Sequence, residues 1–254
     1  MADELVHLHR ADAVATITLD SPANRNALST ALVAQLLDHL AVVGADPQTR
    51  VIVLTHTGST FCAGADLTEM TAGSTETGTQ ALFAALRAIV ELPKPVIARL
   101  TGHARAGGVG LVGAADLAIA PPTATFAFSE ARLGLAPAVI SLTTSSRLTE
   151  RAAARYYLTG DVFDAVEAAA IGLLTVCTDD VDGTVAGYVA SLRRCSPQGL
   201  AQTKAITAAE LRLRLVENGP AMAELSGRLF ASDEAREGMR SFLERRPARW
   251  VAQP

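Results

Sequence analysis

The chain has 254 residues, of which 49% are hydrophobic and 19% charged, with a formal net charge of −4. This composition favours a chain with a sizeable core over a disordered one, and the negative charge argues against nucleic acid or an anionic membrane as the main partner. No apolar run approaches the ~20 residues of a membrane span, and the acidic start lacks the apolar stretch of a signal peptide. Three widely spaced cysteines without a Cys-x-x-Cys pair are typical of reduced thiols in a cytoplasmic protein rather than of a disulfide framework or metal site: Cys62, Cys177 and Cys195.

The N-terminal half predicts a hairpin followed by alternating helices and buried strands. Residues 5–9 and 14–19 alternate apolar and polar side chains, with the turn-favouring Asp12 between them, and predict two antiparallel strands. Ser29 is the expected N-cap of a helix that continues through residue 40. After it we expect a strand at 51–54, a loop of small residues at 57–66, a short helix from 67, a helix at 80–91 and a strand at 95–100. Strands rich in Val, Ile and Leu in this order predict an α/β fold with a largely parallel sheet.

Beyond residue 117 helices dominate the expected structure. Short strands are expected at 117–120 and 126–128, followed by a loop at 130–137. The helices expected after it cover 150–158, 165–170, 181–194, 201–215 and 233–246, with one strand at 171–176 between them. We therefore divide the chain into an α/β core over residues 1–195 and a helical C-terminal region over residues 196–254.

A glycine-rich stretch, Thr101–Asp116, is the feature around which the chain is organised. It holds four glycines within seven residues, Gly107, Gly108, Gly110 and Gly113, and a helix is expected to start just after them. A second turn of small residues, 63–66, also follows a buried strand and opens a helix. If the two turns face each other, two main-chain N–H groups can converge on one oxygen, as the stabilisation of an enolate or tetrahedral oxyanion requires.

Two other interpretations of the glycines are weaker. Gly108, Gly110 and Gly113 spell Gly-x-Gly-x-x-Gly, the fingerprint of dinucleotide-binding turns. That motif requires the strand to end at the first glycine and a full crossover helix to follow, whereas residues 101–107 intervene and the next strand begins at 117. A purely structural glycine turn would leave the paired turn at 63–66 unexplained.

Several short motifs, in order along nearly the whole chain, resemble the crotonase (enoyl-CoA hydratase/isomerase) superfamily. Each motif is weak alone, and their order and spacing together carry the resemblance. The matching segments are Asn26–Leu28, Phe61–Met70, Gly107–Gly108 with Asp116, Phe126–Gly134, Leu158–Asp161 and Glu237–Phe242. The resemblance implies a crotonase-like spiral of ββα turns with a helical C-terminal region that forms a homotrimer or a dimer of trimers.

The resemblance also implies a bent acyl-CoA substrate and no cofactor beyond the CoA that the substrate carries. Its thioester oxygen is expected between the N–H groups of Ala65 and Gly107. Carried over by position, the residues expected to bind the acyl-CoA are Asn24, Arg25, Ala27, Ala63, Asp66, Leu67, Gly108, Phe242 and Arg245. Of these, Phe242 and Arg245 match positions that contact the CoA of a neighbouring subunit, where an arginine can pair with phosphate.

The carboxylates are where the sequence departs from the family pattern. The best-known hydratases of the family use two glutamates; the second aligns with Glu130, and the first falls at Gly110, which has no side chain. We expect Asp66 and Asp116 to be helix-cap or structural acids. A single glutamate can still shuttle a proton between the α-carbon and water, or between the α- and γ-carbons. The resemblance therefore allows a hydratase, a Δ3/Δ2-enoyl-CoA isomerase or a weakly active acyl-CoA-binding paralogue. The run 129–141 resembles branches that hydrate branched or methylglutaconyl-type acyl-CoAs, which favours the hydratase.

Overall fold

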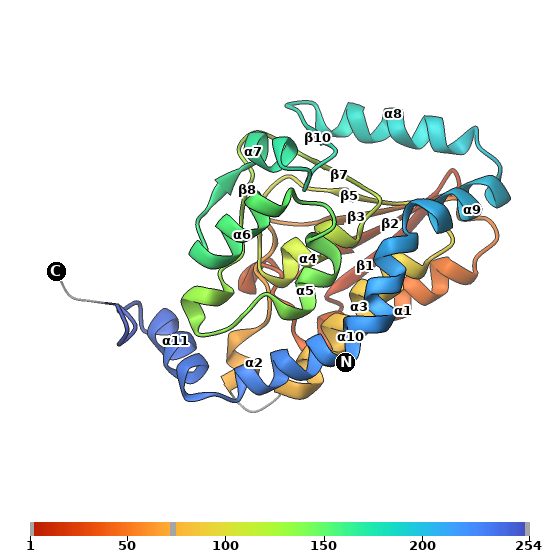
Figure 1. The fold of residues 1–254 in the computed structure, drawn as a ribbon. Coiled ribbons are helices and arrows are strands. Elements are labelled where there is room, and N and C mark those ends of the chain that lie inside the picture. Colours follow the sequence, from red (N-terminus) through yellow and green to blue (C-terminus); the bar gives the residue numbers. More distant parts are fainter. Residues whose placement is uncertain (1–2, 72–74, 252–254) are drawn as a thin grey trace.

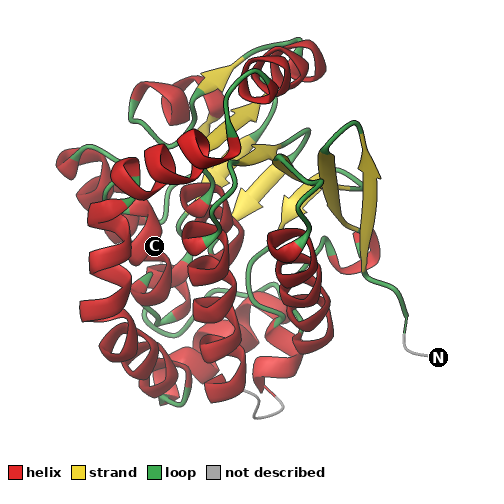
Figure 2. Ribbon diagram, turned by 90° about the vertical axis from the view of Figure 1, so that its right-hand side faces the viewer, coloured by secondary structure: helices red, strands yellow, loops and turns green. Residues whose placement is uncertain are grey.

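The computed structural model describes residues 3–71 and 75–251. Within them two β-sheets and the surrounding helices share a core, so the predicted α/β fold is confirmed (Figures 1 and 2). None of the described helices is both long and apolar enough to cross a membrane.

The larger sheet has the strand order β1-β2-β3-β5-β7-β10. Its strands are β1 (Val6–Ala11), β2 (Val14–Leu19), β3 (Val51–His56), β5 (Val96–Arg99), β7 (Leu117–Ala120) and β10 (Val176–Cys177). The β1–β2 pair is antiparallel and all the other pairs are parallel, as predicted. Asp12 and Ala13 adopt φ values of 50° and 63°, the conformation typical of a two-residue hairpin turn.

Both faces of this sheet are covered. On β3, Ile52 and Leu54 pack with helices α1 (Thr30–Ala45) and α3 (Thr75–Glu91), whereas Val51 and Val53 belong to a separate cluster with α8 (Val181–Arg193). The strand therefore alternates apolar residues between two buried surfaces. The predicted cap of α1 is confirmed, because the Leu32 N–H donates to Ser29 Oγ at 3.2 Å.

A second, four-stranded sheet has the order β4-β6-β8-β9. Its strands are β4 (Thr60–Cys62), β6 (His103–Arg105), β8 (Thr125–Ala127) and β9 (Phe163–Asp164). The strands β4, β6 and β8 are parallel, so the chain leaves all three at the same edge of the sheet. The segments that follow them begin at Ala63, Ala106 and Phe128. This edge therefore gathers the two small-residue turns and the segment that carries Glu130.

The glycines of the central stretch lie inside a helix, not before it. Helix α4 spans Gly107–Ala114, and every one of its residues is buried. Helix α5 (Ala138–Thr144), which the sequence did not predict, packs against α4 at close range. A Cβ added at Gly113 would come within 2.8 Å of the Thr143 carbonyl oxygen. The glycines thus allow two buried helices to approach each other closely, and the dinucleotide interpretation is wrong.

The remaining helices are mostly where the sequence places them. They are α2 (Leu67–Thr71), α6 (Glu150–Thr159), α7 (Ala165–Ala170), α9 (Pro197–Thr207), α10 (Ala209–Phe230) and α11 (Asp233–Leu243), with 3-10 turns η1 (Pro22–Asn24) and η2 (Glu130–Leu133). Two expectations were wrong: the helix over 201–215 is divided at Ala208 between α9 and α10, and the strand over 171–176 is reduced to β10. Helices α9, α10 and α11 make up most of the described chain from residue 197 to residue 243, and the boundary at residue 195 stays a prediction.

A buried lysine holds α9 against the core. Lys204 Nζ donates to the carbonyl oxygens of Ile89 and Lys94, at 2.9 and 3.0 Å, and lies 2.7 Å from Asp116 Oδ2. The same carboxyl oxygen accepts the Val96 N–H at 2.8 Å. Asp116 is thus a structural acid, as predicted.

Candidate active site

A cavity of about 660 Å³ opens at the edge where β4, β6 and β8 end. Ten of the twelve residues predicted for the site line it: Asn24, Arg25, Ala27, Ala63, Ala65, Asp66, Leu67, Gly107, Glu130 and Phe242. The two turns, η1, η2 and α11 therefore meet around one space, although they are far apart in the sequence. Phe242 lines the cavity of its own chain, and its contact with the CoA of a neighbouring subunit stays a prediction.

The two small-residue turns are in direct contact. Gly64 has a φ of +93°, and a Cβ added there would lie 2.9 Å from Ala106 Cβ and 3.4 Å from Gly107 N. Only glycine adopts this conformation readily. On the turn at 106–107, Ala106 has a positive φ of 47°, a conformation that costs free energy in a non-glycine residue. Both backbones are held in uncommon conformations at the point where they touch.

The main-chain amides expected to bind the substrate oxygen have no acceptor within the described part of the protein. Within the described residues, neither the Ala65 N–H nor the Gly107 N–H donates to an acceptor. Gly107 is the first residue of α4, where the N–H has no partner in the helix and the helix dipole concentrates positive charge. On the other turn, the Leu28 N–H donates to the Gly64 carbonyl at 2.8 Å and fixes the segment that precedes Ala65. The cavity thus presents two unpaired donors from adjoining turns.

Glu130 is the buried carboxyl of the cavity. Only 8% of the residue is exposed, and its Oε2 has no hydrogen-bond partner among the described residues. Burial disfavours the ionised form and raises the pKa of the Glu130 carboxyl to about 7. A carboxyl with a pKa near neutrality can both accept and return a proton at physiological pH. Glu130 is therefore not a solvated surface acid.

Gly110, where the resemblance places the family's first glutamate, is covered by an apolar side chain. A Cβ at Gly110 would lie 2.7 Å from Ile140 Cγ2. Gly110 is buried in α4, whereas Ile140 lines the cavity from α5. Among the described residues that line the cavity, no second carboxylate stands beside Glu130 there.

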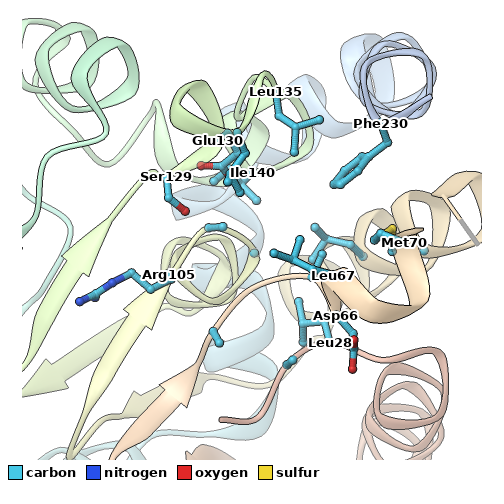
Figure 3. A pocket seen from close by; sticks show the side chains of 18 of the residues that line it. Leu28, Asp66, Leu67, Met70, Arg105, Ser129, Glu130, Leu135, Ile140 and Phe230 are labelled. Carbon is cyan, nitrogen blue, oxygen red and sulfur yellow. The ribbon is translucent and has the colours of Figure 1, made fainter. Parts of the chain in front are cut away.

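The rest of the cavity wall is largely apolar. Figure 3 shows Leu67, Met70, Leu135 and Phe230 around the space opposite Glu130. Arg105 points away from this space: its guanidinium donates to the Thr125 carbonyl at 2.6 Å and to Thr125 Oγ1 at 2.8 Å. Arg105 therefore packs against the second sheet. An apolar wall with few polar groups suits an acyl chain.

Two of the predicted residues lie outside the cavity lining, and a third lines the cavity as a helix cap. Gly108 does not line the cavity, because it faces β4, and an added Cβ would lie 2.5 Å from the Cys62 carbonyl oxygen. Its position fits helix–strand packing, and its contact with the acyl-CoA stays a prediction. Arg245 is exposed and also lies outside the cavity lining of its own chain, so its role toward a neighbouring subunit stays a prediction. Asp66 lines the cavity as a cap: its Oδ1 accepts the Thr68 N–H at 3.0 Å at the start of α2.

Sequence reasoning missed two residues of the cavity wall. Ser129 lies immediately before Glu130, and Ile140 covers Gly110. Ser129 could have been found from its position between the end of β8 and Glu130. Ile140 could not, since α5 itself was not predicted and nothing in the sequence pairs it with Gly110.

Two unpaired main-chain donors and a buried carboxyl thus line one largely apolar cavity, an arrangement typical of sites that bind a carbonyl group. The family model for enoyl-CoA hydratase/isomerase matches residues 9–253. The chain therefore belongs to the enoyl-CoA hydratase/isomerase family, whose substrates are acyl-CoA thioesters.

Known proteins and structures agree with this assignment. The crystal structure of an enoyl-CoA hydratase from Mycobacterium avium has a TM-score of 0.91 and 51% identity, over 98% of this chain and 100% of that one. A Thermus thermophilus protein provisionally named an enoyl-CoA hydratase is 32% identical over 93% of this chain and 97% of its own. The crotonyl-CoA hydratase of Syntrophomonas wolfei is 29% identical over 99% and 100%. The fold is thus the predicted crotonase-like one.

Proposed function

We propose that the protein is an enoyl-CoA hydratase that adds water across the double bond of a 2-enoyl-CoA. The observation that carries the proposal is that two amides without a protein acceptor among the described residues, at Ala65 and Gly107, line the same cavity as Glu130, whose Oε2 likewise has no partner there. The hydratase names of the relatives support water addition over the other reactions of the family.

The proposed reaction needs a single carboxylate. With the thioester oxygen held by the Ala65 and Gly107 N–H groups, the ionised Glu130 takes a proton from water as the water oxygen bonds to the β-carbon. The two amides stabilise the enolate that results. Glu130 then returns the proton to the α-carbon, so that one water is added and the carboxylate is regenerated.

The CoA portion is proposed to leave the cavity between the turn at 63–66 and η1. Asn24, Arg25 and Ala27 lie there together with Ala63 and Leu67, and Arg25 supplies a cation for phosphate. The reaction requires no cofactor other than the CoA of the substrate, and we place it in the cytoplasm.

We further propose that the protein assembles as a trimer or a dimer of trimers. Exposed apolar side chains on α9 and α10 support this, because water-exposed surfaces of this kind mark interfaces: Ile206, Leu213 and Val216.

A second candidate is Δ3/Δ2-enoyl-CoA isomerisation, which the contact between Ile140 and Gly110 supports. With one carboxylate, Glu130 can take the α-proton of a 3-enoyl-CoA and return it to the γ-carbon without adding water. The third candidate, acyl-CoA binding without turnover, would need no ionisable Glu130.

A panel of three CoA thioesters distinguishes the candidates. Saturated, 2-enoyl and 3-enoyl CoA thioesters are given to the wild type and to Glu130→Gln. Hydration of the 2-enoyl-CoA that is lost in Glu130→Gln supports the proposal. Conjugation of the 3-enoyl-CoA without water addition would replace it with isomerisation, and binding without turnover in both proteins would leave only the third candidate.

A further inference from the structure

The residue before Glu130 presents a second polar group to the same cavity. Ser129 lines the cavity and is half-buried. Although it stands at the cap position of η2, its side chain makes no capping hydrogen bond. Its hydroxyl has no partner of any kind among the described residues. Figure 3 shows the Ser129 hydroxyl turned into the space beside the Glu130 carboxyl. A hydroxyl left without a protein partner at this point is available to a molecule in the cavity.

A water that attacks a β-carbon needs two acceptors. Its oxygen must direct a lone pair at carbon, so both of its O–H bonds are best held by acceptors on the protein. Glu130 supplies one. The helix position that would bring a second carboxylate is Gly110, and Ile140 covers it with an apolar side chain. The second acceptor must therefore come from elsewhere on the wall.

We propose that Ser129 is the positioning residue for the attacking water, its Oγ accepting one O–H while Glu130 accepts the other. The inference rests on the proposed hydration. In the step itself, the O–H directed at Glu130 breaks and its proton passes to the carboxylate, while the water oxygen forms its bond to the β-carbon. The O–H held by Ser129 stays intact and becomes the hydroxyl of the product. Ser129 thus takes no proton and orients the nucleophile.

This role separates two reactions of the same site. Hydration needs Ser129, Glu130 and the two amides. Exchange of an α-proton of a saturated acyl-CoA with solvent deuterium needs only Glu130 and the amides, because no water attacks carbon. A residue that merely supports the fold or the position of Glu130 would affect both reactions together.

The test measures both reactions in Ser129→Ala, Ser129→Thr and Glu130→Gln. We expect Ser129→Ala to lower kcat for hydration about 10-fold, the effect of one hydrogen bond in the transition state, with KM and the rate of α-proton exchange within about 2-fold of wild type. Ser129→Thr keeps the hydroxyl and should recover most of kcat, whereas Glu130→Gln should lose both reactions. Ser59→Ala, an exposed serine outside the cavity lining, is the matched control and should leave both unchanged.

The possible results separate the inference from the proposed function. If the wild type hydrates 2-enoyl-CoA and Ser129→Ala does so equally well, only the inference is overturned. Equal loss of hydration and exchange in Ser129→Ala would also overturn it, since Ser129 would then act through Glu130. A wild type that exchanges α-protons but does not hydrate would overturn the proposed function, and the inference with it.

Discussion

Ile140 occupies the space that a side chain at Gly110 would need: a Cβ added at Gly110 would lie 2.7 Å from Ile140 Cγ2 and 3.1 Å from Ile140 Cβ. The two residues belong to α5 and α4, which pack closely at the back of the cavity. A glutamate at position 110 would therefore collide with Ile140 in this arrangement of the two helices.

Gly110→Ala should destabilise the protein through this contact. Overpacking a buried position typically costs about 1–3 kcal/mol, and Ile140→Ala removes the atom that the new Cβ would strike. In a double-mutant cycle measured by urea unfolding, the two substitutions should therefore be clearly non-additive, with the double variant more stable than their sum. Gly187→Ala is the control, because its Cβ would meet nothing within 4 Å on the exposed side of α8. Additive effects would mean that α4 and α5 move apart freely.

The hydration rate should depend on the ionisation of Glu130. Because burial raises the pKa of this carboxyl to about 7, the ionised form that starts the reaction is the minor one at pH 6. We expect kcat/KM to rise about 10-fold per pH unit below 7 and to level off above it. Stopped assays of 2-enoyl-CoA hydration between pH 5 and 9 would measure this. A profile that stays flat down to pH 5 would mean that Glu130 is not the base.

Much of this site follows from the sequence because its parts lie in short segments with a physical signature. The turns at 63–66 and 106–107 are marked by residues small enough for close backbone contact, and Glu130 by its place after a predicted strand. The short strands β4 and β6 were missed because three residues show no periodicity. The contact between Gly110 and Ile140 could not be predicted either, since it depends on how two buried helices pack rather than on any local pattern.

Glu130→Gln should stabilise the protein at alkaline pH while abolishing turnover. The folded-state pKa of Glu130 is raised above the usual 4.5 to about 7, so the native state binds this proton more tightly than the unfolded state does. The contribution of Glu130 to stability is therefore present at pH 4 and is lost as the pH rises to 7. Glutamine does not titrate, so the variant should exceed the wild type by up to about 3 kcal/mol at pH 8 and by little at pH 4. Urea unfolding at both pH values gives the comparison, and a difference independent of pH would contradict it.

Gly64→Ala should damage catalysis more than its effect on stability suggests. The added methyl group would press on Ala106 Cβ and on Gly107 N, and alanine resists the φ of +93° found there. Both effects shift the amides of the adjoining turns. Because losing one oxyanion donor typically costs about 10²–10³-fold in kcat, we expect a loss of that order in both hydration and α-proton exchange. Gly58→Ala tests a glycine with a φ of +72° outside the cavity lining and should lose stability while keeping kcat.

Lys204→Met should be among the most destabilising substitutions outside the cavity. The Lys204 side chain is only 3% exposed. Its replacement would leave Asp116 without the cation 2.7 Å away, and the Ile89 and Lys94 carbonyl oxygens without the donor that they share. Removing one partner of a buried ion pair typically costs about 3–5 kcal/mol.

Lys94→Met is the matched control, since Lys94 donates to the Val43 and Asp46 carbonyl oxygens in a more open position. This substitution should cost about 1 kcal/mol. Urea unfolding of both variants provides the measurement. The double variant Lys204→Met/Asp116→Asn is expected to recover part of the loss, because the carboxylate that Lys204 faces is then neutral as well. Equal costs for the two lysines would show that the charge on Lys204 contributes no more than an ordinary pair of hydrogen bonds.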